Sequence, residues 1–311
     1  MTAPALLLLV LGACEDNSSD AWDPPEGWSP EDVPLPEVLA EDLDEPRGIA
    51  LVGDAIYVAE YGAGRVVRLE DGTPVEVASG LEGPWMLAAD DADPVVSERD
   101  GGRVLRLGAD GTPEVLAEGL VQPGRILAEG GLVAWVDEGG DGDGTVGWTD
   151  GGVAGSAAEP LSGPLGFTLD GQTLLVAERY TQEIVHVALS DGTLETVAGL
   201  DGAPQDLQVS DGLIYATAYT YSWPRTSFVF VVDGDEVEEL LETPPVPGWI
   251  RLSGETLLWA CGTGIASGSI EGGDYRVIAV ESAVGDLIVA DDRAIWTDYQ
   301  SGEVLSVDLG E

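Results

Sequence analysis

The chain contains no lysine, one histidine and two cysteines, and these shortages exclude several classes of function. Twelve arginines supply all the basic charge against 58 acidic residues, so the formal net charge is −46. A field of that sign repels nucleic acids and anionic lipid headgroups, and we expect neither as a partner. Unidentified proteins and neutral or cationic ligands remain as expected partners. The solitary His186 excludes zinc sites built from several histidines and argues against a Ser-His-Asp triad.

Long apolar runs are also missing. The run at residues 5–12 is too short to span a bilayer and has the length of a signal-peptide core. It leads into Leu11-Gly12-Ala13-Cys14, which resembles the bacterial lipobox. The resemblance implies a lipoprotein signal peptide at residues 1–13, lipidation of Cys14, and attachment to a bacterial membrane in the cell envelope, on the periplasmic or outer side. Cys261 is then the only other cysteine, so no internal disulfide can form.

Two further regions follow the lipobox. Residues 14–36 are acidic, rich in proline, serine and aspartate, and free of apolar periodicity, which predicts an extended tether. Residues 37–311 form one continuous repeat array, which predicts a single domain. The membrane contact that we expect is the lipid anchor alone, and we expect the domain to act as a monomer.

One register repeats seven times in this domain. A proline at the end of a turn is followed fourteen residues later by an acidic residue that closes an apolar strand. The pairs are Pro46 with Glu60, Pro84 with Glu98, Pro123 with Asp137 and Pro164 with Glu178, and then, with one member replaced, Pro204 with Ala218, Pro247 with Cys261 and Val284 with Asp298. A repeat of about 40 residues built from short strands is typical of a β-propeller blade.

The first repeat illustrates the four expected strands of a blade. Apolar segments at residues 48–52, 55–59, 65–69 and 75–78 are separated by glycine-containing turns such as Asp71-Gly72. A fourth-strand pattern at residues 38–43 precedes the first repeat, whereas the last repeat has only three strands. We therefore predict an all-β, seven-bladed propeller whose N-terminal strand completes the last blade. Six blades are the alternative, should the degenerate repeat around Gly139 or Ser267 not form.

Short motifs resemble known propeller families. Residues 56–60 and 295–298 resemble the second strands of NHL and YWTD repeats, and residues 81–85 resemble a repeat start in the senescence marker protein/gluconolactonase group. The gluconolactonase resemblance implies a divalent cation held by glutamate, asparagine and aspartate. Glu82 matches the glutamate and Asp206 or Asp286 the aspartate, but the chain has no asparagine beyond Asn17, so the asparagine has no counterpart.

A second candidate cation site is the string of alternating aspartate and glycine at residues 137–144. Asp137, Asp141 and Asp143 could direct oxygen atoms at a hard cation such as Ca²⁺. The string lacks the downstream glutamate of a full EF-hand loop, and a solvated hairpin turn is the competing interpretation.

The turns before first strands and after second strands project from the same face of a propeller, where binding loops are common. Arginines and aromatic residues gather in these turns: Arg47, Tyr61, Trp85, Arg99, Arg125, Arg179, Tyr180, Tyr219, Tyr221, Trp223, Trp249, Arg251 and Tyr299. The core of the predicted ligand-binding face is Arg47, Trp85, Arg125, Tyr219, Tyr221, Trp223 and Trp249. A protein- or ligand-binding module is the function we predict. The alternatives are a Ca²⁺-dependent hydrolase or lactonase of gluconolactonase type and a saccharide-binding module.

Overall fold

The computed structural model describes residues 33–90, 93–108, 111–140, 142–221, 226–243, 247–261, 264–280 and 282–310. Cys14, most of the tether, Asp141 and Trp223 lie outside these ranges, so the signal peptide and lipid anchor stay predictions. Within the described ranges no helix is long and apolar enough to cross a membrane.

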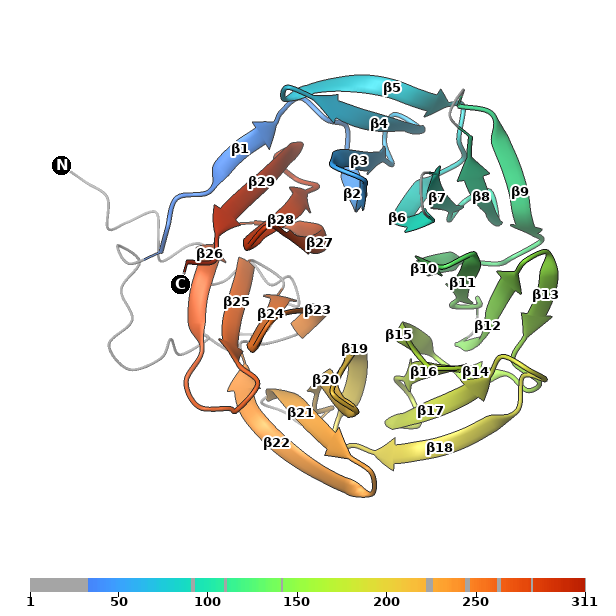
Figure 1. Ribbon diagram of the computed structural model, residues 1–311, viewed down its shortest axis with the longest axis vertical. Coiled ribbons are helices and arrows are strands. Elements are labelled where there is room, and N and C mark those ends of the chain that lie inside the picture. Colours follow the sequence, from blue (N-terminus) through green and yellow to red (C-terminus); the bar gives the residue numbers. More distant parts are fainter. Residues whose placement is uncertain are drawn as a thin grey trace.

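Seven antiparallel sheets surround a common axis, and this confirms the all-β, seven-bladed propeller (Figure 1). Blades 1 to 3 contain β2 (Pro46–Val52), β3 (Ala55–Glu60), β4 (Arg65–Glu70) and β5 (Thr73–Ser79); β6 (Pro84–Asp90), β7 (Asp93–Glu98), β8 (Arg103–Leu107) and β9 (Pro113–Glu118); and β10 (Pro123–Glu129), β11 (Leu132–Asp137), β12 (Asp143–Asp150) and β13 (Val153–Ser156). Blades 4 to 6 contain β15 (Pro164–Asp170), β16 (Thr173–Glu178), β17 (Glu183–Ala188) and β18 (Leu194–Gly199); β19 (Ala203–Ser210), β20 (Leu213–Tyr219), β21 (Ser227–Asp233) and β22 (Glu236–Thr243); and β23 (Pro247–Ser253), β24 (Thr256–Cys261), β25 (Gly264–Ser269) and β26 (Arg276–Val280). Blade 7 contains β27 (Val284–Ala290), β28 (Arg293–Asp298), β29 (Glu303–Asp308) and β1 (Glu37–Ala40). In blade 3, the short β14 (Leu161–Ser162) also pairs with β12.

The ring closes where the sequence predicts. The N-terminal β1 pairs antiparallel with β29, so Val38 lies opposite Leu305 and the last blade gains its fourth strand. The six-blade alternative is wrong, because both degenerate repeats form complete sheets. Gly139 lies in the turn that leads into β12 of blade 3, and Ser267 lies on β25 of blade 6.

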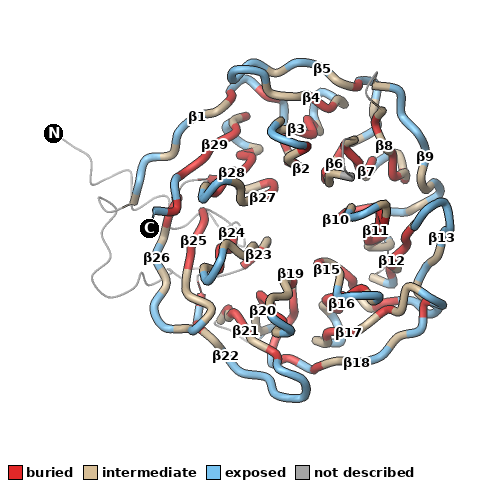
Figure 2. Tube along the Cα trace, in the orientation of Figure 1, coloured by how far each residue is buried: buried red, intermediate tan, exposed pale blue. Residues whose placement is uncertain are grey.

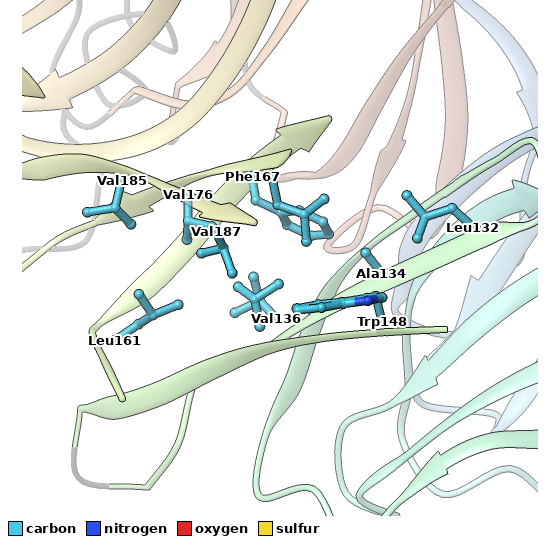
Figure 3. Packing of buried hydrophobic residues seen from close by; sticks show 11 residues of the cluster. Leu132, Ala134, Val136, Trp148, Leu161, Phe167, Val176, Val185 and Val187 are labelled. Atoms are coloured by element: carbon cyan, nitrogen blue, oxygen red, sulfur yellow. The ribbon is translucent and has the colours of Figure 1, made fainter. Parts of the chain in front are cut away.

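The hydrophobic core is divided among the junctions between blades. Each of the seven junctions contains its own cluster of buried apolar side chains, contributed by the two sheets that face each other. Between blades 3 and 4, Trp148 and Phe167 pack with smaller residues such as Val136 and Val176 (Figure 3). Middle strands therefore bury both faces and read as continuous apolar runs, whereas outer strands are largely exposed (Figure 2).

A β-bulge recurs in the innermost strand of every blade. In blade 1, Pro46 pairs with Glu60 but Ile49 pairs with Val58, so one extra residue is accommodated between them. The corresponding shift occurs in the other six blades. A bulge redirects the side chains of the unpaired residues, and here it does so at the same end of all seven inner strands.

Candidate functional site

The bulges create a ring of seven equivalent positions near the central axis. Each lies two residues after the first residue of the repeated register (Pro46 in blade 1). Together they are termed the axial ring: Gly48, Met86, Arg125, Gly166, Asp206, Trp249 and Asp286. The side of the propeller on which inner strands begin and second strands end is termed the upper face. The axial ring therefore lies toward the upper face, beneath the turns that the sequence predicts as a binding face.

An ion-pair network connects the charged members of the axial ring. A guanidinium nitrogen of Arg125 lies 2.9 Å from Asp206, and Arg251 lies 3.2 Å from the same carboxylate oxygen. Arg251 also binds Asp286 at 3.0 Å. Arg125 is in blade 3 and Asp206 is in blade 5, so the ion pair between them spans the inner strand of blade 4. Gly166 lies at that point, where the absence of a side chain leaves room for Asp206.

Both aspartates also accept hydrogen bonds from backbone amides. The N–H of Ile250 in blade 6 donates to Asp206 at 3.0 Å, and the N–H of Ile49 in blade 1 donates to Asp286 at 3.4 Å. Each carboxylate also accepts the N–H of the residue that follows it, Leu207 or Leu287. The network therefore ties blade 5 to blade 6 and blade 7 to blade 1, in addition to the side-chain contacts across the axis.

Burial sets the electrostatics of the network. The Asp206 side chain is fully buried, and that of Arg125 is 11% exposed. Desolvation lowers the pKa of Arg125, although Asp206 opposes the effect. Desolvation likewise raises the pKa of Asp286 against the opposing influence of Arg251 and Arg125. The two arginines and two aspartates balance in formal charge, which makes their joint burial tolerable.

A chain of arginines and aromatic rings covers the upper face from blade 7 to blade 3. The guanidinium carbon of Arg47 lies 3.9 Å from the ring centroid of Tyr299 and 4.8 Å from that of Trp85. Arg99 lies 4.9 Å from the Trp85 centroid and forms a bidentate pair with Glu138 at 2.8 and 2.9 Å. Such guanidinium–ring contacts combine stacking with attraction to the ring quadrupole.

Trp85 and Trp249 are engaged within the chain. Tyr61 meets Trp85 edge to face at a centroid distance of 5.6 Å. On the other side of the ring of blades, Arg125 lies 4.6 Å from the Trp249 centroid, and the indole N–H of Trp249 donates to the carbonyl of Gly285 at 2.8 Å. These contacts hold both indole rings in fixed positions and occupy part of their surfaces. On this side of the molecule the arginines are the principal charged groups next to the aromatic rings.

The tyrosines of the fifth repeat extend this face toward blade 4. Tyr219 and Tyr221 meet edge to face at 5.8 Å, and the Tyr221 hydroxyl donates to the carbonyl of Arg179 at 3.0 Å. Tyr221 and Tyr180 remain about half exposed. Arg179 in turn lies 5.1 Å from the ring of Tyr180.

The repeated acidic residues that close the second strands have a separate role. Their carboxylates bind backbone amides of the turn that precedes the inner strand of the same blade: Asp44 to Glu60, Glu82 to Glu98, Val121 and Gln122 to Asp137, Ser162 to Glu178, and Ala283 to Asp298. Glu60 and Glu98 also pair with Arg65 and Arg103 of the following strand. These contacts stabilise each blade internally and engage both oxygens of the Glu60, Glu98 and Glu178 carboxylates.

The carboxylates suggested by the gluconolactonase resemblance fit a divalent cation poorly as they are placed. Asp206 and Asp286 are already neutralised by Arg125 and Arg251. Glu82 is exposed on the upper face, and its neighbours are Glu98 and Gly101 of its own blade. In the part of the chain that the structure describes, no group of three or more histidine, cysteine, aspartate or glutamate side chains is arranged to hold a metal ion.

The second candidate cation site is only partly described, since Asp141 lies outside the described residues. Asp137 is buried and accepts amide hydrogen bonds from Val121, Gln122 and Gly139. Asp143 is exposed at the start of β12, opposite Ser162 of β14. The contacts of Asp137 are those of a turn-capping carboxylate.

Sequence reasoning places the arginines and aromatic residues on one face but misses the ion-pair network. Asp206 and Asp286 appear there as cation ligands, whereas the structure gives them arginine partners. A usable signal was present, because aligning the repeats on their first residue puts Arg125, Asp206 and Asp286 in one column. Opposite charges in a single column of a closed ring indicate contacts across the axis.

Comparisons with known proteins identify the fold. No protein-family model matches the chain, and no curated protein matches it. Among solved structures, streptogramin B lyase is similar with a TM-score of 0.70 and 14% identity, over 88% of this chain and 96% of that one. A gluconolactonase from Xanthomonas campestris has a TM-score of 0.56 and 17% identity, over 88% and 89% of the two chains. A chain of the nidogen/laminin complex has a TM-score of 0.51 and 20% identity, over 64% and 80%. The protein is thus a β-propeller structurally similar to these three, and identities this low establish the fold alone.

Proposed function

We propose that this protein is a lipid-anchored, extracytoplasmic binding module whose ligand site is the arginine–aromatic upper face. The main support for this proposal is the concentration of arginine side chains on one face. In the described part of the chain, Arg47, Arg99, Arg125, Arg179 and Arg251 all lie on or just below this face, although the whole chain has only twelve arginines among 58 acidic residues. Guanidinium groups and aromatic rings bind ligands but do not exchange protons at neutral pH, which favours binding over catalysis.

The anchoring part of the proposal is tested with Cys14→Ser in a bacterial host. We expect the native chain to fractionate with membranes and to incorporate labelled palmitate, because acyl chains bury several methylene groups at about 0.8 kcal/mol each. The variant should lose the label and leave the membrane fraction. Equal membrane association of the two chains would contradict the anchor and leave the binding face unaffected.

The binding part is tested by thermal unfolding against a panel of neutral, cationic and anionic small molecules. Tyr221→Ala alters an exposed residue of the upper face, and Val153→Ala alters a residue that is 72% exposed on an outer strand. We expect at least one compound to raise the unfolding temperature of the native chain and of Val153→Ala but to act less on Tyr221→Ala. A ligand at one hundred times its dissociation constant stabilises by about 2.7 kcal/mol, which such a scan detects. Equal shifts in all three chains for every compound would contradict a site on this face.

A further inference from the structure

Arg47 differs from Arg99, Arg125 and Arg251 of the upper face in how its charge is balanced. Arg99 is paired with Glu138, and Arg125 and Arg251 are paired with buried aspartates. Among the described residues, the Arg47 guanidinium has no carboxylate partner, and its buried Nε atom has no hydrogen-bond partner. Arg179 shares the unpartnered Nε but contacts a single ring, that of the exposed Tyr180.

An unpaired guanidinium is unexpected in this chain. Acidic residues outnumber basic ones 58 to 12, so a carboxylate partner is easily supplied for any arginine on the surface. Half-burying an unpaired charge costs free energy, and proteins normally avoid that cost by pairing the charge. The positions of the two rings next to Arg47 explain how it is tolerated, since cation–π contacts replace part of the lost hydration.

The positions of Tyr299 and Trp85 also restrict the kind of ligand that the Arg47 guanidinium can bind. Tyr299 belongs to blade 7 and Trp85 to blade 2, so the Arg47 side chain of blade 1 is held by rings from both neighbouring blades. A guanidinium held next to aromatic rings still carries N–H donors for hydrogen bonds. Because the Nε atom of Arg47 is buried, a ligand would bind at the two terminal nitrogens. The edge formed by these two nitrogens matches the two oxygens of a planar carboxylate, which it binds in bidentate fashion.

The surroundings limit the rest of the ligand. Tyr61, Trp85 and Tyr299 provide aromatic surface beside Arg47, which favours an apolar or aromatic body. The net charge of −46 repels multiply charged anions, which favours a single negative charge. We therefore propose that Arg47 binds the carboxylate of a small, singly charged organic acid. This inference rests on the proposed binding function and reverses, at this one position, the preference for neutral or cationic ligands that the overall charge predicts.

Isothermal titration of the full-length chain with benzoate tests the proposal, with benzamide as the neutral analogue of the same shape. We expect benzoate to bind at one site at least tenfold more tightly than benzamide. Arg47→Gln should weaken benzoate binding at least tenfold. Arg68→Gln removes the same unit charge from the same blade, at an exposed ion pair with Glu70, and should change binding less than twofold.

Arg47→Lys provides a second variant in case the glutamine variant folds poorly. It keeps the charge but loses the planar fork, so benzoate binding should fall between the native chain and Arg47→Gln. Equal binding of benzoate and benzamide, or equal losses in Arg47→Gln and Arg68→Gln, would overturn the carboxylate site. If the small-molecule panel still distinguishes Tyr221→Ala from Val153→Ala while benzoate does not bind, the binding function stands and only this inference fails.

Discussion

Two sets of buried carboxylates occupy different regions of this propeller. The first set closes the second strands and consists of Glu60, Glu98, Asp137, Glu178 and Asp298. Its members accept amides from a turn of their own blade. The second set consists of Asp206 and Asp286 in the axial ring, which bind amides and arginines of other blades.

The difference shows that repeated residues and unrepeated residues have different tasks in this fold. A residue type that recurs in five blades performs a task that each blade needs, here the capping of a turn. The axial aspartates occur in only two blades, 5 and 7, and their arginine partners lie in blades 3 and 6, so their task is specific to a few positions of the ring. Blades 5 and 6 lack the capping acid, having Ala218 and Cys261 in its place, and the axial contact from Asp206 to Ile250 joins the same two blades.

The largest expected effect is the removal of the central axial carboxylate by Asp206→Ala. Arg125 and Arg251 would be left buried next to each other without this partner, which typically costs about 3–5 kcal/mol of unfolding free energy. Urea unfolding measures the loss. Glu114→Ala, which removes the exposed partner of Arg106, is the control and should cost less than about 1 kcal/mol. Similar losses in the two variants would show that the axial network is no more important than a surface pair.

Gly166→Ala tests the close approach that lets Asp206 reach across blade 4. An added Cβ would lie 2.4 Å from the Cα of Asp206 and 2.6 Å from the carbonyl oxygen of Gln205, so the inner strands of blades 4 and 5 would have to move apart. We expect a loss of about 1–3 kcal/mol, as for overpacking of a core. Gly199→Ala meets no atom within 4 Å and should be nearly neutral. A neutral Gly166→Ala would mean that the strands are not held at this distance.

The pH dependence of stability distinguishes the axial pair from exposed carboxylates. Because burial raises the pKa of Asp286 in the folded state, its contribution to folding is complete below the unfolded pKa of about 3.9 and is lost as the pH rises through the folded pKa. Asp286→Asn removes this titration. The stability of the native chain relative to the variant should therefore decrease as the pH rises above about 4 in urea unfolding. An increase would show that Arg251 and Arg125 outweigh burial.

A smaller loss of stability, equal from blade to blade, is expected for the first set of carboxylates, which cap the turns. Glu98→Gln keeps an acceptor for the amide of Glu82 but loses its charged pair with Arg103, which is 35% exposed. We expect a loss of about 1 kcal/mol. Glu60→Gln, with the equivalent contacts to Asp44 and Arg65, should cost the same amount within error. Unequal costs would contradict the view that repetition reports one role within each blade.

The smallest effect is expected on the exposed rim of the upper face. The Tyr61 hydroxyl donates to Asp100 at 2.9 Å, and this hydrogen bond is the main cause of the raised pKa of Tyr61. Tyr61→Phe removes the bond but leaves the ring beside Trp85, so we expect a change of less than about 0.5 kcal/mol in thermal unfolding. A larger loss would indicate that the Tyr61–Asp100 hydrogen bond helps to hold the neighbouring arginines and aromatic rings in place.

Much of the candidate site could be predicted because turns before first strands and after second strands share one face. Arg47, Trp85 and Tyr299 were assigned to that face from their positions in the repeat, and the structure places them in contact. The pairing of Arg125 with Asp206 could not be predicted in the same way, since the two residues are 81 positions apart, by subtraction, and belong to blades that are not neighbours. Their contact depends on the diameter of the ring and on the bulge of each inner strand.

The sequence by itself determined the strands, their order and the closure of the ring. Those features follow from local apolar patterns, turn residues and a constant register, all of which act within about 40 residues. Only the tertiary structure decided that there are seven blades and not six, and which side chains meet at the axis. The physical reason is that ring closure brings inner strands from distant repeats within ion-pair distance, so the charge balance at the centre is a property of the whole ring and not of any single blade.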